Sequence, residues 1–263
     1  MPETLPTTIV VPCYDEAERL PLDRFRAAVA RDPALRFLFV DDGSRDATPR
    51  LLEALAREAP ARFDWHRLAR NAGKAEAVRQ GMLRALAGAP GCAGYWDADL
   101  STPLEDVAAL RAILETRPEV ALVLGARVRL LGRSIERRAL RHYGGRVFAT
   151  GASWVLGLPV YDTQCGAKLF RATPEVAALF ADPFVVNWSF DVELLARFVS
   201  ARRAQGRPAA EAIYEHPLHT WFDVPGSRVR PWDLPRGLIE LLRIRRRYPP
   251  VGARGARRAR GSA

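Results

Sequence analysis

The first half of the chain alternates short apolar runs with helix-like stretches, and this alternation is what most constrains the fold. Five runs have the apolar, β-branched composition of buried strands: residues 7–12, 37–40, 63–68, 93–97 and 120–125. Helix-like stretches lie between them, at residues 24–31, 47–58, 74–87 and 104–116. The pattern predicts an α/β fold with a mainly parallel central sheet and helices on both faces.

The second half has less regular signals. It predicts a helix over residues 134–156, a loop over 161–168, a helix over 190–204, a strand over 211–221 and a helix over 236–248. The 263 residues are 48% hydrophobic, enough to bury one sizeable core. We therefore expect one domain over residues 1–235, followed over 236–263 by a basic helix and an arginine-rich, disordered tail.

Carboxylates follow two of the predicted strands. Asp42 comes after the second strand, and Asp97 and Asp99 come after the fourth. Ligands of parallel α/β sheets bind at the carboxyl ends of strands, and paired carboxylates there suit Mg²⁺ or Mn²⁺. Each pattern has a structural alternative, because Asp42 could form a turn and Asp99 could cap the following helix.

Further polar groups are candidates for phosphate chemistry. Lys74 stands at the start of a helix, where exposed N–H groups favour anions. Asp191 stands at the start of another helix, where a carboxylate could face a site or simply complement the helix dipole. A run of arginines follows the fifth strand and could clamp phosphate or form a solvated face: residues 127, 129, 133, 137, 138 and 141.

The net charge of +10 is concentrated at the end of the chain. Eight arginines lie beyond Glu240 with no acid among them, and without them the net charge is +2. Such a tail could bind anionic lipid or nucleic acid, or remain solvated. The nearly neutral body has no nucleic-acid-binding module, so we expect no nucleic-acid partner. Three scattered cysteines and no secretory leader predict a cytoplasmic protein.

The order of these segments is more informative than any one of them. The strings VPCYDE (11–16), VDDGSRDAT (40–48), NAGK (71–74) and DAD (97–99) together resemble glycosyltransferase family 2. The later strings GAR (125–127), DTQCGAKLF (162–170), FDVELL (190–195) and GSR (226–228) resemble its dolichyl-phosphate glucosyltransferase branch. The resemblance implies a GT-A fold, inverting chemistry and a divalent cation, Mg²⁺ or Mn²⁺.

The resemblance also implies roles for individual residues. Pro12, Tyr14 and Glu16 are expected to line the base pocket, with Asp42 on the base. Asp97 is expected to contact the ribose or the metal, and Asp99 to be the main metal ligand. Arg127 and Arg137 match positions that hold the acceptor phosphate. Two positions depart from the family pattern: Asp15 replaces the usual Asn, and Ser101 replaces a metal-binding Gln found in related mannose synthases.

The expected reaction moves one sugar, expected to be glucose from a UDP-linked donor, to a polyprenyl or dolichyl phosphate. Lys74 and the metal would offset charge on the leaving diphosphate. A phosphate acceptor is largely ionised at pH 7 and needs no general base, so Asp191 would orient the reactants. The alternative is a hydroxyl acceptor, for which Asp191 would be the base. The uncharged stretch 147–161 is too short to cross a bilayer, and we expect it to lie against the cytoplasmic membrane face.

Overall fold

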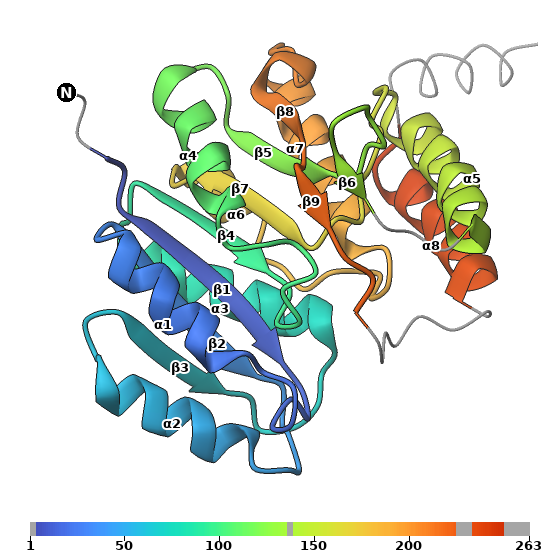
Figure 1. The fold of residues 1–263 in the computed structure, drawn as a ribbon. Coiled ribbons are helices and arrows are strands. Elements are labelled where there is room, and N and C mark those ends of the chain that lie inside the picture. Colours follow the sequence, from blue (N-terminus) through green and yellow to red (C-terminus); the bar gives the residue numbers. More distant parts are fainter. Residues whose placement is uncertain (1–3, 136–138, 225–232, 250–263) are drawn as a thin grey trace, which may run out of the picture.

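The computed structural model describes residues 4–135, 139–224 and 233–249. Within these ranges the chain forms a seven-stranded sheet flanked by helices (Figure 1). The strand order is β3-β2-β1-β4-β7-β5-β8. The bounds are β1 Thr7–Cys13, β2 Leu35–Asp41, β3 Phe63–Arg67, β4 Cys92–Trp96, β5 Leu122–Ala126, β7 Ala167–Arg171 and β8 Ile213–Pro217. A separate two-stranded ribbon pairs β6 (Ser134–Ile135) with β9 (Thr220–Trp221).

The direction of the strands brings distant segments to one edge of the sheet. Strands β1 to β4 run parallel, β7 is antiparallel to both β4 and β5, and β8 is parallel to β5. Consequently the carboxyl ends of β1, β2, β4 and β5 meet the beginning of β7 at the same edge. The predicted α/β architecture with a mainly parallel sheet is confirmed, with β7 as the antiparallel exception.

Two apolar layers cover the faces of the sheet. One contains α1 (Leu22–Arg31), α2 (Thr48–Glu58) and α4 (Asp106–Thr116). The other contains α3 (Lys74–Ala87), α5 (Ala139–Leu156), α6 (Pro174–Ala178), α7 (Phe190–Ala204) and α8 (Asp233–Arg247). Strands buried between these layers read as continuous apolar runs, which explains why the sequence predicts them.

Three expectations for the second half need correction. The helix expected from residue 134 starts at Ala139, because Ser134–Ile135 forms β6 and pairs with β9. The strand expected over 211–221 is a 3₁₀ turn, Ala210–Ala212, followed by β8 and β9. The predicted loop ends at Ala167, where β7 begins. Each difference depends on pairing with distant segments, which local sequence does not specify.

Helix α8 packs on the rest of the fold. It lies beside α5 in Figure 1 and also contacts α7. Its inward face carries Gly237, Glu240, Leu241 and Ile244, at the spacing of one helix face. Within the described residues, no helix is long and apolar enough to cross a membrane.

Candidate active site

The loop that follows β2 is tied to the loop that opens α3. Asp42 is buried, and its two carboxylate oxygens accept hydrogen bonds from Ala72 N (2.7 Å) and Gly73 N (2.8 Å). Burial raises the pKa of Asp42, and the two N–H donors partly offset that rise. The predicted contact of Asp42 with the base remains a prediction. What the geometry adds is that Asp42 fixes the backbone immediately before Lys74.

Lys74 reaches from α3 to the end of β4. Its Nζ lies 2.5 Å from Oδ1 of Asp97. Partial burial would lower the pKa of Lys74, whose side chain is 45% exposed, but the carboxylates of Asp97, Asp191 and Asp99 outweigh that effect, and the pKa is raised. Three of the predicted site carboxylates are therefore within electrostatic range of one ammonium group.

Asp97 is held tightly against the start of β7. Its N–H donates to the carbonyl of Gly166 at 3.0 Å. A Cβ added at Gly166 would lie 1.9 Å from Oδ2 of Asp97, so only glycine leaves room for this carboxylate. The DTQCGAKLF segment thus shapes the pocket around Asp97 from the neighbouring strand.

The two carboxylates after β4 have the chemistry of a divalent-cation site. Asp99 Oδ1 accepts hydrogen bonds from Ser101 N and Oγ, which orients the side chain within its turn. The buried Oδ1 of Asp97 forms an ion pair with the Lys74 ammonium. Among the described residues, no third His, Cys, Asp or Glu completes a cluster. Two carboxylates fit Mg²⁺ or Mn²⁺, which take further oxygens from substrate phosphate and water.

The loop after β1 borders the same edge. Pro12 pairs with Val40 in the sheet, and Tyr14, half-buried, follows the strand. Glu16 is buried, and both of its carboxylate oxygens accept from Arg19. Asp15 has a φ of +48°, a conformation that Asn and Asp tolerate better than most residues. The Asp-for-Asn departure at this position therefore preserves the backbone.

A buried ion pair holds Asp191 at the start of α7. Oδ1 of Asp191 accepts from Lys168 Nζ at 2.6 Å and from the Tyr95 hydroxyl. The Lys168 side chain is 0% exposed and also donates to the carbonyl of Cys165. Burial and the adjacent Asp191 carboxylate raise the pKa of Tyr95 well above its usual value. The phenol therefore stays protonated and continues to donate.

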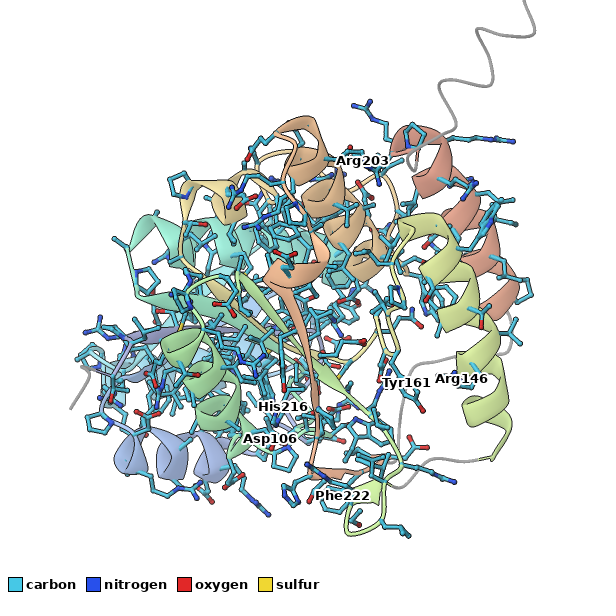
Figure 2. All side chains as sticks on the ribbon, turned by 90° about the horizontal axis from the view of Figure 1, so that it is seen from above. Asp106, Arg146, Tyr161, Arg203, His216 and Phe222 are labelled. Atoms are coloured by element: carbon cyan, nitrogen blue, oxygen red, sulfur yellow. The ribbon has the colours of Figure 1, made fainter. Side chains whose placement is uncertain are left out.

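Arg127 is engaged by an acid of the same DTQCGAKLF segment. Its Nε and Nη2 donate to Asp162 Oδ2 (2.6 Å) and Oδ1 (2.7 Å). Burial would lower the pKa of Arg127, but Asp162 outweighs it and the pKa is raised. Beside this pair, the guanidinium of Arg146 lies 4.4 Å from the ring centroid of Tyr161 (Figure 2). Arg127 as an acceptor-phosphate ligand remains a prediction.

Some predicted positions lie outside the described residues. Arg137, the second predicted acceptor-phosphate residue, is one of them, and so is the GSR segment at 226–228. The remaining predicted residues lie along the carboxyl edge of the sheet or on the loops and helices next to it: Pro12, Tyr14, Glu16, Asp42, Lys74, Asp97, Asp99, Arg127 and Asp191.

Sequence reasoning assigned no role to Lys168, Tyr95 or Asp162. A compositional signal for Lys168 was available, because the chain has 40 basic residues but only two lysines, Lys74 and Lys168. Each of the two forms an ion pair with a carboxylate of the site, Lys74 with Asp97 and Lys168 with Asp191. An ammonium is compact and a guanidinium is a broad planar fork, so the two are not interchangeable at such contacts.

Taken together, the mainly parallel GT-A sheet and the acidic edge with its lysine define a glycosyltransferase. The family model described as Glycosyl transferase family 2 matches residues 8–175. The chain belongs to this family.

Comparison with curated proteins gives relatives that align over most of the chain. The dolichyl-phosphate beta-glucosyltransferase of Homo sapiens is 32% identical over 277 residues, covering 94% of this chain and 79% of the human protein. The undecaprenyl-phosphate 4-deoxy-4-formamido-L-arabinose transferase of Pseudomonas fluorescens is 31% identical over 63% of this chain and 47% of its own length. Both names describe sugar transfer to a polyprenyl phosphate.

Solved structures share the fold. Glucosyl-3-phosphoglycerate synthase from Mycobacterium tuberculosis, in complex with Mn²⁺ and UDP-glucose, superposes with a TM-score of 0.59 and 18% identity. The match covers 94% of this chain and 81% of that one. The same enzyme has also been crystallised with Mg²⁺ and UDP. At this identity the likeness establishes the architecture.

Proposed function

We propose that this protein transfers a single glucose from UDP-glucose to a polyprenyl phosphate with inversion at the anomeric carbon. The polyprenyl phosphate acceptor is supported by the names of relatives that align over most of the chain. The UDP-glucose donor is supported by those glucosyltransferases and by the UDP-glucose complex of a structural neighbour. Asp97 and Asp99 would hold a divalent cation, which would neutralise charge on the leaving diphosphate.

The observation that carries this proposal is the bonding of Asp191. An acceptor phosphate oxygen attacks the anomeric carbon, the bond from that carbon to the UDP oxygen breaks, and UDP leaves with the electron pair. No proton has to be removed, because the phosphate is already ionised. Asp191, whose Oδ1 accepts from both Lys168 and Tyr95, is suited to orient reactants. A hydroxyl acceptor would instead require Asp191 to take a proton while holding two donors.

Lys74 is the residue of this chain placed to meet the leaving group. Its ammonium pairs with the Asp97 carboxylate. The residue itself is the first of α3, where the helix N–H groups also favour anions. Asp42 holds the preceding backbone. Lys74 and the first N–H groups of α3 would bind the diphosphate and stabilise its developing charge.

The test is a transfer assay with purified protein. Radiolabelled UDP-glucose, UDP-galactose and GDP-mannose are each incubated with polyprenyl phosphate and Mg²⁺ or Mn²⁺, and the organic phase is counted. We expect label from UDP-glucose alone, lost in excess EDTA and in Asp99→Asn. The control Asp64→Asn, at an exposed surface ion pair, should keep full activity. Faster glucosylation of a soluble hydroxyl acceptor would favour the alternative function.

We also propose that the protein works at the cytoplasmic face of an anionic membrane. Five large apolar side chains are exposed on α5 and α8: Val147, Trp154, Leu238, Ile239 and Leu242. We call them the apolar α5–α8 surface. The two helices approach closely, since a Cβ added at Gly151 of α5 would lie 3.0 Å from Leu241 and 4.0 Å from Leu238 of α8. Such a surface on a monomer is typical of a binding face.

Positive charge borders the same surface. The guanidinium of Arg245 lies 3.4 Å from the ring centroid of Trp154 and donates to its carbonyl. Arg245, Arg246 and Arg247 form the last turn of α8. Apolar side chains bordered by arginines suit an anionic bilayer. In sedimentation with anionic vesicles, Ile239→Glu with Leu242→Glu should abolish binding, while Val185→Glu at another exposed apolar position should not. Equal sedimentation of the wild type and both variants would contradict the assignment of this surface to membrane binding.

A further inference from the structure

Glu240 is a buried acid in the most basic part of the chain. Helix α8 carries Arg236 and the arginines at its end, yet the Glu240 residue is 3% exposed and faces inward. A carboxylate is rarely buried without a specific partner. The reaction proposed above uses neither Glu240 nor any other residue of α8.

Glu240 joins its own helix to backbone groups at the start of α7. Its Oε2 accepts from Ser189 N at 2.7 Å, and its Oε1 accepts from Arg236 Nε of α8 at 3.3 Å and from Trp188 N at 3.4 Å. Ser189 is the N-cap residue of α7, but its own side chain makes no capping bond, and its Oγ is buried without a partner. Glu240 therefore accepts, from another helix, the N–H of the N-cap residue, as the N3 acid does in a capping box, and places a negative charge near the positive end of the α7 dipole.

Asp191 follows Ser189 by two residues, so it lies next to the segment that Glu240 holds, residues 188–189. A Cβ added at Gly237 would lie 2.3 Å from the Trp188 ring, so α8 presses directly on this segment. Trp188 also packs edge-on against Phe148 of α5 with ring centroids 5.1 Å apart, and the same Cβ position lies 3.0 Å from the Phe148 ring. The Trp188 side chain thus packs against both α5 and α8, and the segment that it anchors leads directly into Asp191.

The same segment approaches the other lysine of the site. Asn187 Oδ1 lies 3.8 Å from the position of a Cβ added at Gly73, the residue before Lys74. Helix α8 consequently supports a short stretch of chain that borders both Lys74 and Asp191.

We propose that Glu240 is a positioning residue for Asp191: its carboxylate fixes the first turn of α7 so that Asp191 meets Lys168 and Tyr95. This inference rests on the proposed function only in the experiment that measures turnover. A residue that merely stabilised α8 would change the free energy of unfolding and leave the folded enzyme's turnover unchanged.

The first arm of the test measures turnover against donor binding. In Glu240→Ala we expect kcat for transfer to polyprenyl phosphate to fall on the order of 10- to 100-fold, as for a reactive group displaced by about 1 Å. The Kd for UDP with Mn²⁺ should change little, because Asp42 and Asp97 lie on other elements. Glu240→Gln keeps one acceptor oxygen and should lose less activity.

The matched control changes a glutamate of α6 that contacts the other end of α7. Glu175 accepts from Arg202 Nε (2.9 Å) and Nη2 (3.0 Å), and Arg202 lies in the last turn of α7. Glu175→Gln should lower the melting temperature and leave kcat unchanged. Equal losses of kcat in Glu175→Gln and Glu240→Gln would overturn the positioning role.

The second arm needs no substrate and so separates this inference from the proposed function. Incorporation of 3-fluorotyrosine, with the resonance assigned by Tyr95→Phe, gives a ¹⁹F signal beside Asp191. We expect Glu240→Ala to shift the Tyr95 resonance and Glu175→Gln to leave it in place. If wild-type protein shows no transfer but the resonance shifts, the proposed function fails and the positioning role stands. An unchanged Tyr95 resonance in Glu240→Ala overturns the role.

Discussion

The ammonium of Lys168 lies 2.6 Å from Oδ1 of Asp191, with side-chain exposures of 0% and 8%. Removing either partner leaves a buried, uncompensated charge, which typically costs about 3–5 kcal/mol. We expect Lys168→Met and Asp191→Asn each to be destabilised on this scale. The double variant should be less destabilised than the sum of the two. Urea denaturation of the four proteins gives the coupling free energy directly, and strict additivity would show that the ion pair contributes nothing.

Gly166→Ala tests how β7 shapes the nucleotide site. The new methyl group would lie 1.9 Å from Oδ2 of Asp97, so the carboxylate has to move by more than 1 Å. We expect turnover to fall on the order of 100-fold, with UDP binding in Mn²⁺ weakened in parallel.

The control for that substitution is Gly145→Ala, where an added Cβ meets nothing within 4 Å. Gly145 lies inside α5, and alanine is favoured over glycine in a helix, so its stability should be kept or slightly raised. Full activity in Gly166→Ala, measured in the transfer assay, would mean that Asp97 tolerates displacement.

The parts of the fold that the sequence predicted are those with strong local signals. Strands β1 and β2 are buried on both faces, so their apolar runs are conspicuous. Strand β7 was missed because it follows a polar segment and contains Lys168, whose buried ammonium is neutralised by Asp191. That pairing is a tertiary contact and leaves no periodic signal.

The candidate site shows the same division. Asp42, Asp97 and Asp99 were predicted because strand ends can be read from the sequence. The partners of Arg127 and Asp191 could not be read, because Asp162 and Lys168 come from an antiparallel strand and the loop before it. Glu240 was noted only as the last acid of the chain, since nothing local indicates which face of α8 packs inward.

Arg127 and Asp162 call for a paired test. Arg127→Ala alone removes the bidentate partner of the mostly buried Asp162, so a loss of activity could reflect damage to the fold. The double variant Arg127→Met with Asp162→Asn removes both charges together. If Arg127 holds the acceptor phosphate, the double variant should bind UDP normally but show a KM for polyprenyl phosphate raised roughly tenfold, the effect of one lost charged hydrogen bond. A normal KM would assign the pair a purely structural role.

Asp106 gives a prediction for the pH dependence of stability. It is the first residue of α4 (Figure 2), it is 9% exposed, and its Oδ2 is buried without a hydrogen bond. Burial raises its pKa to about 6 from 3.8, opposed by the nearby charges of His219 and Arg133 and reinforced by Glu105. Between pH 4 and pH 6 the folded state therefore holds a proton that the unfolded state has lost.

The sign of the effect follows from this difference. A raised carboxyl pKa lowers the free energy of unfolding as pH rises through the window, and the full penalty, at most about 3 kcal/mol, is present above pH 6. Asp106→Asn cannot ionise, so it should be more stable than wild type at pH 7 and lose that advantage near pH 4. Urea denaturation at pH 4, 5, 6 and 7 measures the difference in free energy of unfolding between the two proteins. The contributions of the other titrating groups are the same in both and cancel. Asp23→Asn, a 98% exposed acid on α1, controls for the loss of one surface charge. A constant difference between wild type and Asp106→Asn at all four pH values would show that folding does not raise the pKa of Asp106.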